Sequence, residues 1–336
     1  MSNRKILVTG GAGYIGSITS ARLRLAGFET LVFDNMSSGH DWAIGEGRLV
    51  RGDILDTEAL IQVMRDWKPD AVIHFAALIA AGESVEKPLT YYLNNVGGVN
   101  SVLTAMVEAG VPSIVFSSTA SIFGSTTSEP LSEDLPIQPE NPYASSKAMC
   151  ETILKDACKA YGLKAIALRY FNAAGADTEN QLGEAHEPET HLIPLVLEVA
   201  SGKRKEITIY GTDYDTPDGT CVRDYVHVVD LAQAHIRALD RLAEGAGSNS
   251  PGGFETFNIG VGKGFSVKEV IDTCRDVTGH AIPTKVGQRR EGDPSSLTCA
   301  PGKANTVLGW SPVYPELSDI ISHAWEWEKD RRRLGR

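Results

Sequence analysis

The sequence has little cysteine and no long apolar run. Its 336 residues include five cysteines, an odd number without a C-x-x-C pair. This pattern disfavours a disulfide framework or a cysteine zinc site and fits reduced thiols in a cytoplasm. No apolar run approaches the roughly 18 residues that cross a bilayer, and Ile6–Val8 is too short for a signal-peptide core. We therefore expect a cytoplasmic protein without a membrane segment or a metal site.

An excess of basic charge is also missing. The chain carries 43 acidic and 32 basic residues, a net charge of −11, which argues against a nucleic-acid-binding protein. An anionic small ligand remains compatible, because single arginines and helix N-termini bind anions on acidic proteins. The apolar share of 42% is typical of a globular protein with a core. The length suggests two domains, or one large domain with a lobe.

Short apolar runs alternate with longer helix-compatible segments through the first half. Such alternation predicts βαβ units and an α/β fold, a Rossmann-type doubly wound parallel sheet. Strands are expected at 5–9, 30–33, 49–51, 71–75, 113–117 and 164–168, and helices at 14–26, 57–67, 89–109 and 143–161.

From about Phe171 the alternation stops. Gly, Pro, Asp and Thr are dense in 172–188 and 211–220, and such long loops are often functional. Shorter elements follow, expected at 229–242, 256–259, 267–277 and 317–329. The pattern predicts a nucleotide-binding domain over residues 1–170, to which some later segments return. Residues 171–336 then form mainly a smaller mixed α/β lobe for the substrate.

A glycine turn follows the first predicted strand. Gly10, Gly13 and Gly16 form G-x-x-G-x-x-G before a helix, a pattern that lets backbone N–H groups approach a pyrophosphate. Asp34 ends the second strand, where a carboxylate accepts hydrogen bonds from ribose hydroxyls and repels a 2′-phosphate. The sequence therefore predicts NAD rather than NADP. Asp53, after the third strand, is expected on the adenine side.

A Tyr-x-x-x-Lys pair indicates chemistry. Tyr143 and Lys147 lie one turn apart if the segment is helical, and a nearby cation stabilises a phenolate base. The strand-end hydroxyl residues Ser117, Ser118 and Thr119 precede this pair. A hydroxyl from that group is expected to bond a substrate oxygen beside Tyr143.

Together these motifs resemble the extended short-chain dehydrogenase/reductase superfamily, and within it the UDP-glucose 4-epimerase family. The resemblance implies NAD-dependent epimerisation at C4 of a UDP-hexose through a 4-keto intermediate. It also implies a homodimer formed through the helices at 89–109 and 143–161. The matching blocks cover nearly the whole chain and are Thr9–Ser17, Gly82–Val85, Arg169–Asn172, Gly219–His227 and Arg289–Asp293.

The resemblance also implies roles for single residues. Tyr143 would take the proton of the sugar 4-hydroxyl, Lys147 would lower the pKa of Tyr143 and hold the nicotinamide ribose, and Thr119 stands where the family has a catalytic serine. With Tyr143 and Lys147, the implied cofactor contacts are Gly10, Gly13, Tyr14, Ile15, Gly16, Asp34, Asn35, Asp53, Ile54, Phe75, Ala76, Ala77, Asn94, Ser117 and Tyr170. The implied substrate contacts are Ser118, Thr119, Asn172, His191, Leu192, Tyr210, Arg223, Arg290 and Asp293.

Some positions depart from the family pattern and leave alternatives open. Ile79 replaces a lysine that reaches the cofactor phosphate, and His191 replaces an asparagine near the uracil. Leu297 stands where some members have a tyrosine, which suggests room for an N-acetyl group. The alternatives are a 4-epimerase of UDP-N-acetylglucosamine, UDP-glucuronate or UDP-xylose, a nucleotide-sugar dehydratase and a non-catalytic NAD-binding sensor. Dehydratases carry an Asp-Glu pair after the strand-end hydroxyl, whereas Ala120 follows Thr119 here.

Overall fold

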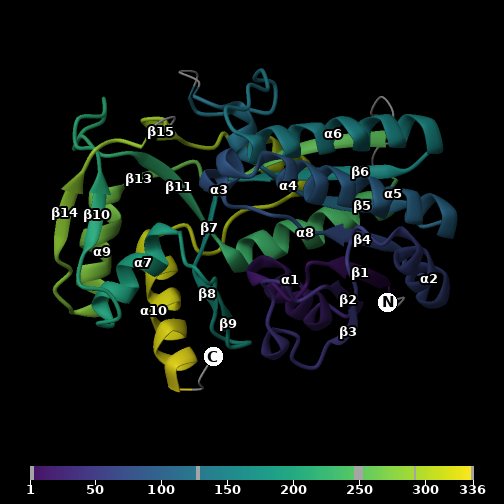
Figure 1. The fold of residues 1–336 in the computed structure, drawn as a ribbon, viewed down its shortest axis with the longest axis horizontal. Coiled ribbons are helices and arrows are strands. Elements are labelled where there is room, and N and C mark those ends of the chain that lie inside the picture. Colours follow the sequence, from purple (N-terminus) through teal and green to yellow (C-terminus); the bar gives the residue numbers. More distant parts are fainter. Residues whose placement is uncertain (1–3, 126–128, 246–252, 291–292, 334–336) are drawn as a thin grey trace.

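The computed structural model describes residues 4–125, 129–245, 253–290 and 293–333. At its centre, seven parallel strands form one sheet in the order β12-β6-β5-β4-β1-β2-β3 (Figure 1). The order reverses beside β1, as in doubly wound nucleotide-binding folds, so the predicted Rossmann-type sheet is confirmed. The strands are β1 (Lys5–Thr9), β2 (Glu29–Asp34), β3 (Arg48–Arg51), β4 (Ala71–His74), β5 (Ser113–Thr119), β6 (Lys164–Tyr170) and β12 (Phe254–Ile259).

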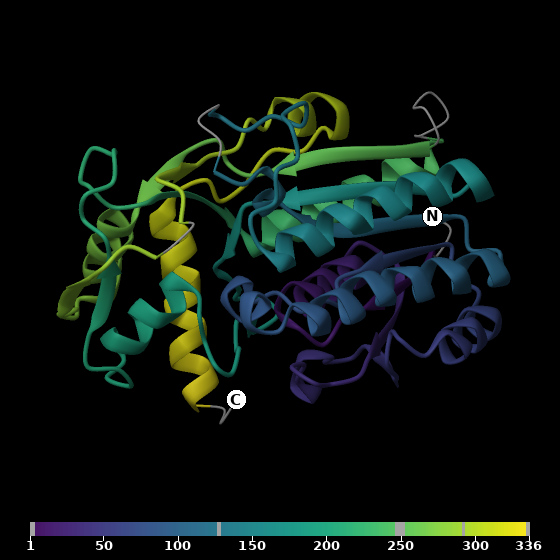
Figure 2. The same ribbon diagram turned by 45° about the horizontal axis from the view of Figure 1, so that its top comes forward.

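Helices cover both faces of this sheet. They are α1 (Tyr14–Leu25), α2 (Thr57–Trp67), α5 (Gly98–Ala109), α6 (Pro142–Tyr161) and α8 (Val228–Ala243). Leu7 packs in one apolar cluster with α2, α5 and α6, whereas its neighbours Ile6 and Val8 pack with α1 and α8. Figure 2 shows α5 and α6 side by side along one face. Because both faces are buried, the strands are apolar almost throughout rather than alternating.

The helix predicted over 89–109 is not one regular α-helix. It consists of α4 (Pro88–Tyr91), a π-helical segment η2 (Tyr92–Gly97) and α5. Asn95 on η2 is buried; its side-chain oxygen accepts from the Leu78 N–H at 2.8 Å and its amide donates to the Leu78 carbonyl at 3.0 Å. These bonds tie the helix to the segment after β4. Single π-turns within helices are frequent at functional sites.

Residues after 171 build a second lobe and also return to the large sheet. The lobe contains a four-stranded sheet of β7 (Asn172–Ala174), β11 (Val222–His227), β13 (Gly264–Ser266) and β15 (Ser296–Leu297). It packs with α7 (Leu192–Ala200), α9 (Val267–Thr278) and α10 (Leu317–Arg333), at the left of Figure 1. By contrast, β12 pairs with β6. The remaining elements are η1 (Asp41–Ala43), α3 (Ala81–Glu86), η3 (Ala120–Phe123), β8 (Ala176–Asp177), β9 (Leu182–Gly183), β10 (Ile207–Tyr210), β14 (Thr284–Gly287) and η5 (Ala304–Leu308).

The five cysteines are all unpaired and buried. Burial raises the pKa of both Cys150 and Cys274 to about 12, so each stays a protonated thiol that packs like a small apolar side chain. Among the helices of the described ranges, none is long and apolar enough to cross a bilayer.

His235 of α8 is buried in its neutral form between the helix and the sheet. Its Nδ1–H donates to the Leu231 carbonyl at 2.8 Å, and its Nε2 accepts from the Tyr170 hydroxyl at 2.8 Å. Burial lowers the pKa of His235 to about 4. His235 therefore stays neutral in the folded protein at pH values at which the same histidine is protonated in the unfolded chain, below about pH 6.5.

Because the folded-state pKa of His235 is depressed, the free energy of unfolding falls as pH drops below about 6.5. This histidine accounts for about 2 kcal/mol of the loss between pH 7 and pH 5. We expect His235→Gln to show a loss smaller by that amount in urea denaturation at the two pH values. His280→Gln, which changes an exposed ring, is the control and should behave as wild type. The same pH dependence in all three proteins would contradict this account.

Candidate active site

The turn between β1 and α1 carries the three glycines of the predicted cofactor motif. Gly10 has a φ of +72°, and a Cβ built on it would lie 2.4 Å from the backbone nitrogen of Ala76. A Cβ on Gly16 would lie 2.3 Å from the carbonyl oxygen of Gly10. Both positions require glycine, because the turn packs against its own backbone and against the end of β4.

Gly13 is different, because packing within the protein does not require a glycine there. The nearest atom to a Cβ at this position would be the Gly10 carbonyl oxygen, at an ordinary 3.5 Å. Gly13 caps α1, where no side chain accepts from the first N–H groups and the first turn, with Tyr14 and Ile15, has no acidic residue. The free N–H groups and the positive end of the helix dipole form an anion site that fits a pyrophosphate.

Acidic and amide side chains gather beside this turn at the ends of β2 and β3. The Asp34 carboxylate accepts from the backbone N–H of Ala12 at 2.9 Å and of Met36 at 2.8 Å, which fixes its position. A carboxylate so held retains lone pairs for further donors. Asp53 accepts from the Asn35 amide at 3.0 Å. The structure thus brings three predicted cofactor residues to one edge of the sheet.

Tyr143 and Lys147 lie one turn apart near the start of α6, which Asn141 caps through its side chain. The Tyr143 phenol lies beside the hydroxyl of Thr119 at the end of β5, close enough for that hydroxyl to lower the pKa of the phenol. The Lys147 ammonium donates to the Ser117 carbonyl at 2.8 Å. The three side chains predicted to carry the chemistry are therefore neighbours, although Thr119 is 24 residues from Tyr143 in the chain.

Burial controls the protonation of this group. It raises the pKa of Tyr143, and the neighbouring Thr119 hydroxyl offsets only part of that rise. It also lowers the pKa of Lys147 to about 8, so the ammonium is charged at neutral pH. In the protein alone burial outweighs the other effects, so a lowering of the Tyr143 pKa by Lys147 stays a prediction for the complex with cofactor. A phenolate here needs further positive charge beside the ring.

Ser118 does not join this group. Its hydroxyl donates to the Glu151 carboxylate at 2.5 Å, and Glu151 also accepts two bonds from Arg169. Strand alternation sends Ser118 to the face of the sheet that carries α6, opposite to the side of its neighbours in β5. The prediction that Ser118 contacts substrate through its side chain is corrected, because its hydroxyl belongs to a buried ion-pair network.

The other predicted cofactor residues lie after β3 and β4, on η2 and at the end of β6. The N–H groups of Phe75 and Ala76 donate to the Thr9 carbonyl at 2.9 and 3.2 Å. These bonds hold the segment of Phe75, Ala76 and Ala77 beside the glycine turn. The Asn94 amide donates to the Asn95 side chain at 3.0 Å. Ile54 and Tyr170 are buried, and the Tyr170 phenol bonds His235 inside the protein.

The lobe supplies a second group of predicted residues. Arg223 on β11 forms an ion pair with Asp293, and the Arg290 guanidinium lies 4.2 Å from the centre of the Tyr210 ring. The Asn172 amide donates to the Asp224 carbonyl at 3.0 Å. Glu291 and Gly292, from the same sequence block, lie outside the described residues. Two arginines are thus available for an anionic ligand.

Leu297 lies between the two groups. It pairs with Arg223 across β15 and β11, and it packs against the apolar cluster of Ala120, Ile122 and Phe123 in η3, the turn that follows Thr119. A change in size at Leu297 therefore acts close to both the hydroxyl of Thr119 and the arginine of the lobe.

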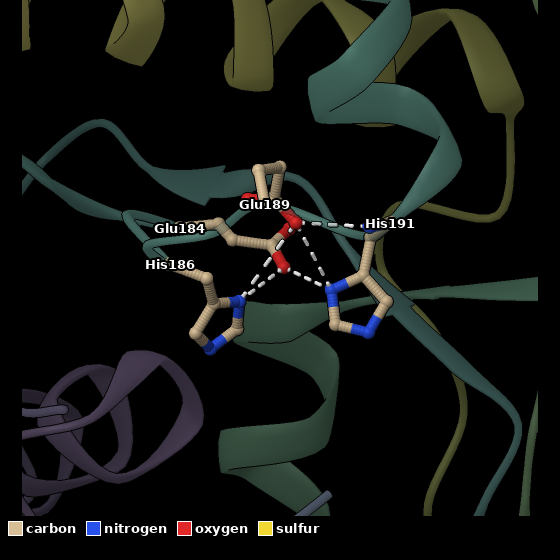
Figure 3. Close-up of side chains that lie close together, drawn as sticks. All are labelled: Glu184, His186, Glu189 and His191. Carbon is tan, nitrogen blue, oxygen red and sulfur yellow. Dashed lines mark hydrogen bonds and ion pairs between the residues drawn. The ribbon is translucent and has the colours of Figure 1, made fainter. Parts of the chain in front are cut away.

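His191 has a different environment from the predicted uracil contact. It caps α7 just before Leu192, and its Nδ1 bonds the Glu184 carboxylate, with His186 and Glu189 beside it (Figure 3). Burial disfavours its charge, but the two carboxylates outweigh this effect and raise the pKa of His191. This group of side chains was not predicted from the sequence. The spacing Glu-x-His-x-x-Glu-x-His from Glu184 to His191 is the sequence pattern from which it could have been found.

Asp224 is a second residue that sequence reasoning missed. Its buried carboxylate accepts from the N–H groups of Val261 at 2.9 Å, Gly262 at 2.8 Å and Cys299 at 3.1 Å. It thereby joins β11 to the ends of β12 and β15 and holds Arg223 in place. No local pattern reveals such a role, because the three partners come from distant segments.

Comparison with known proteins agrees with this geometry. Residues 6–260 match the model of the NAD dependent epimerase/dehydratase family. The UDP-glucose 4-epimerase of Halalkalibacterium halodurans is 49% identical over 97% of this chain and 96% of its own. The crystal structure of UDP-glucose 4-epimerase from Brucella ovis with NAD has a TM-score of 0.92 at 44% identity, over 96% of this chain and 98% of that one.

A further similar structure is the UDP-Glc/GlcNAc 4-epimerase of Campylobacter jejuni, with a TM-score of 0.84 at 40% identity, over 97% of this chain and 99% of that one. The relatives and structures cover nearly the whole chain, and the family model covers residues 6–260. This chain therefore belongs to the NAD dependent epimerase/dehydratase family.

Proposed function

We propose that this chain interconverts UDP-glucose and UDP-galactose by inverting C4 of the hexose with NAD. The observation that carries the proposal is that Tyr143 lies beside Thr119 and one helical turn from the buried cation Lys147, which donates to the end of β5. This group lies at the same edge of the sheet as the glycine turn. The name UDP-glucose 4-epimerase that the similar proteins bear supports this activity.

The residues around the glycine turn support NAD as the cofactor. The open N-terminus of α1 would take the pyrophosphate, and Asp34 would accept from the adenosine ribose and repel a 2′-phosphate. When bound, NAD supplies a hydride acceptor and a cationic nicotinamide ring. Lys147 would donate to the ribose next to that ring.

The chemistry of this chain is proton transfer and positioning. Tyr143 would take the proton of the sugar 4-hydroxyl while Thr119 bonds the same oxygen, and a 4-keto sugar results when hydride leaves C4. The sugar would then present its other face, and Tyr143 would return the proton as hydride comes back. There is no net oxidation, so the product differs from the substrate only in the configuration at C4.

Turning the sugar requires a firm hold on the nucleotide. We propose that residues 1–170 hold mainly the cofactor and that the lobe from residue 171 holds mainly UDP. Arg223 and Arg290 would meet the diphosphate, and Asp293 would take a ribose hydroxyl. Asn172, Leu192 and Tyr210 complete this set.

The two other reaction classes fit less well. Elimination of the sugar 6-hydroxyl needs an acid and a base close to the strand-end hydroxyl. Thr119 is followed by Ala120, Ser121 and Ile122, which fold into the η3 turn and offer no carboxylate. A non-catalytic sensor has no need for a Tyr-x-x-x-Lys pair whose buried lysine is bonded to the sheet.

Tyr143→Phe removes the proton acceptor and leaves the ring. We expect its kcat for converting UDP-galactose into UDP-glucose to fall by about 10²–10⁴, the usual worth of a general base, with UDP affinity unchanged. Tyr161→Phe, at the exposed end of the same helix, is the matched control and should keep full activity. Wild-type turnover retained by Tyr143→Phe would refute the assigned role. A wild-type protein that binds UDP but does not turn over UDP-galactose would point to another UDP sugar.

A second substrate, UDP-N-acetylglucosamine, is favoured by Leu297. This side chain packs against the turn after Thr119 and is smaller than the tyrosine expected at this position in some members. The similar epimerase from Campylobacter jejuni is named for both UDP-Glc and UDP-GlcNAc, which supports the same breadth here.

Leu297→Tyr tests this breadth. We expect kcat/KM for UDP-N-acetylglucosamine to fall by about 10–200-fold through crowding, whereas kcat/KM for UDP-glucose stays within a few-fold. Leu297→Met keeps the volume and should accept both sugars. If the wild-type enzyme does not turn over UDP-N-acetylglucosamine at high concentration, the hypothesis is wrong.

We propose that the enzyme is a cytoplasmic homodimer. Five unpaired, buried cysteines support the reducing compartment. Exposed apolar side chains on adjoining helices support the dimer, because Leu89 is 82% exposed on α4, Leu93 64% on η2 and Met149 48% on α6. Such patches are the usual cores of subunit interfaces.

Charge at the centre of this patch should separate the subunits. We expect Leu93→Glu with Met149→Glu to convert a dimer into a monomer in light scattering coupled to gel filtration. Val286→Glu changes an equally exposed apolar residue on β14 of the lobe and should leave the mass unchanged. A monomeric wild-type protein, or a double variant that remains dimeric, would exclude this interface.

A further inference from the structure

Four potential metal ligands meet at one point outside the proposed chemical centre. Glu184, His186, Glu189 and His191 come from one segment between β9 and α7. One ligand atom from each lies within 4.8 Å of all the others. Figure 3 shows the two imidazoles and both carboxylates converging on a common centre. Four of the five ligand-type side chains in these eight residues thus converge on one centre, and only Glu187 is exposed outside it.

The spacing of these atoms suits a small ion. The His186 Nδ1 lies 2.9 Å from Glu184 Oε1 and 4.0 Å from Glu189 Oε1, and the His191 Nδ1 lies 3.5 Å from Glu189 Oε1. Tetrahedral ligands about 2.0–2.1 Å from Zn²⁺ are about 3.3 Å apart. These three separations bracket that value. His191 Nδ1 and Glu184 Oε1 are in direct hydrogen-bond contact, so an ion must replace that bond and the two side chains must rotate apart.

Charge and burial also call for a cation. The side chains of Glu184 and Glu189 are only 6% and 7% exposed, yet both face the same centre. Two buried carboxylates at one point repel unless positive charge lies between them. A protonated His191 supplies such charge when no ion is bound, and a divalent ion would take the place of its proton. A divalent ion balances both carboxylates and leaves the histidines neutral, the form in which imidazole binds metals.

Access to this centre is provided by a cavity. Glu184, His186 and Glu189 line it on one side, and α7 and α10 close it on the others, with Trp327 and Arg331 in its wall. A metal site needs an entry path. The cavity provides one, and its lining does not include Tyr143 or Thr119.

We propose that these four residues bind one divalent transition-metal ion, with Zn²⁺ as the best fit. The ligands are the Nδ1 atoms of His186 and His191 and one carboxylate oxygen each of Glu184 and Glu189. Two imidazole nitrogens favour Zn²⁺ and its neighbours over Mg²⁺ or Ca²⁺, which prefer oxygen alone. The absence of C-x-x-C had suggested no zinc site, but this ligand set contains no cysteine.

The ion is structural, because it holds one segment against several others. The His186 ring meets the Tyr14 ring edge to face at 6.2 Å, and His40 donates to the Ala185 carbonyl at 2.8 Å. Tyr14 itself donates to the Gly175 carbonyl at 2.6 Å. A metal at this centre braces the contact between the lobe and the glycine turn, and it fixes the start of α7.

Metal content tests the proposal independently of the epimerase activity. Tag-free protein is stripped with EDTA, dialysed against Zn²⁺ and then against buffer, and its zinc is measured by mass spectrometry. We expect one zinc per chain in wild type and at least tenfold weaker binding in His186→Ala and His191→Ala. His280→Ala, which removes an exposed histidine elsewhere, should keep one zinc. Wild-type protein without stoichiometric zinc, or variants that bind as well as wild type, would overturn the site.

A second measurement covers the case in which a histidine variant misfolds. Glu184→Gln keeps the shape of the side chain but removes its charge, and circular dichroism checks its fold. Co²⁺ is added to wild type and to this variant, and the visible ligand-field bands are recorded. Intense bands of a four-coordinate site in wild type that weaken in Glu184→Gln support the proposal. No bands in wild type, or equal bands in both proteins, show a hydrogen-bonded cluster that holds no metal.

Discussion

The close approach of the Gly10 backbone to that of Ala76 is the constraint on which the site depends. With no Cβ at Gly10, the Thr9 carbonyl accepts from both Phe75 and Ala76, and β1 and β4 end side by side. That contact opens the N-terminus of α1 and places it beside the edge where β5 presents Thr119. Any larger residue at Gly10 would separate the anion site from the hydroxyl and phenol groups, so cofactor and substrate could not meet.

Burial then decides the character of the groups at that edge. Lys147 is almost fully buried, yet it keeps a donor bond to the Ser117 carbonyl and lies 4.9 Å from the centre of the Phe116 ring. A cation held in this way retains its charge at neutral pH although burial lowers its pKa to about 8. Burial raises the pKa of Tyr143 instead, because it favours the neutral phenol over the phenolate. The pair therefore needs a positively charged ring beside it before the phenol becomes an effective base.

The lobe is joined to the sheet by polar contacts as well as by apolar packing. The Asp224 carboxylate accepts hydrogen bonds from three backbone N–H groups of two other segments. Burial raises the pKa of Asp224 to about 6. The Glu184–His191 segment makes a second junction, between α10 and the glycine turn. The carboxylates of both junctions, Asp224, Glu184 and Glu189, have little exposure, so the relative position of the two parts depends partly on electrostatics inside the protein.

The sequence by itself determined the elements and the chemistry-bearing motifs. Periodicity and glycine spacing are local, so the strands, most helices, the glycine turn and the Tyr143–Lys147 pair could be predicted from them. Only the tertiary structure decided which partners the polar side chains choose. Ser118 turns to Glu151, Tyr170 to His235 and His191 to Glu184, and the helix at 89–109 contains a π-segment around Asn95. Most of these partners are determined by contacts between distant segments or by burial, and the local pattern of residues predicts neither.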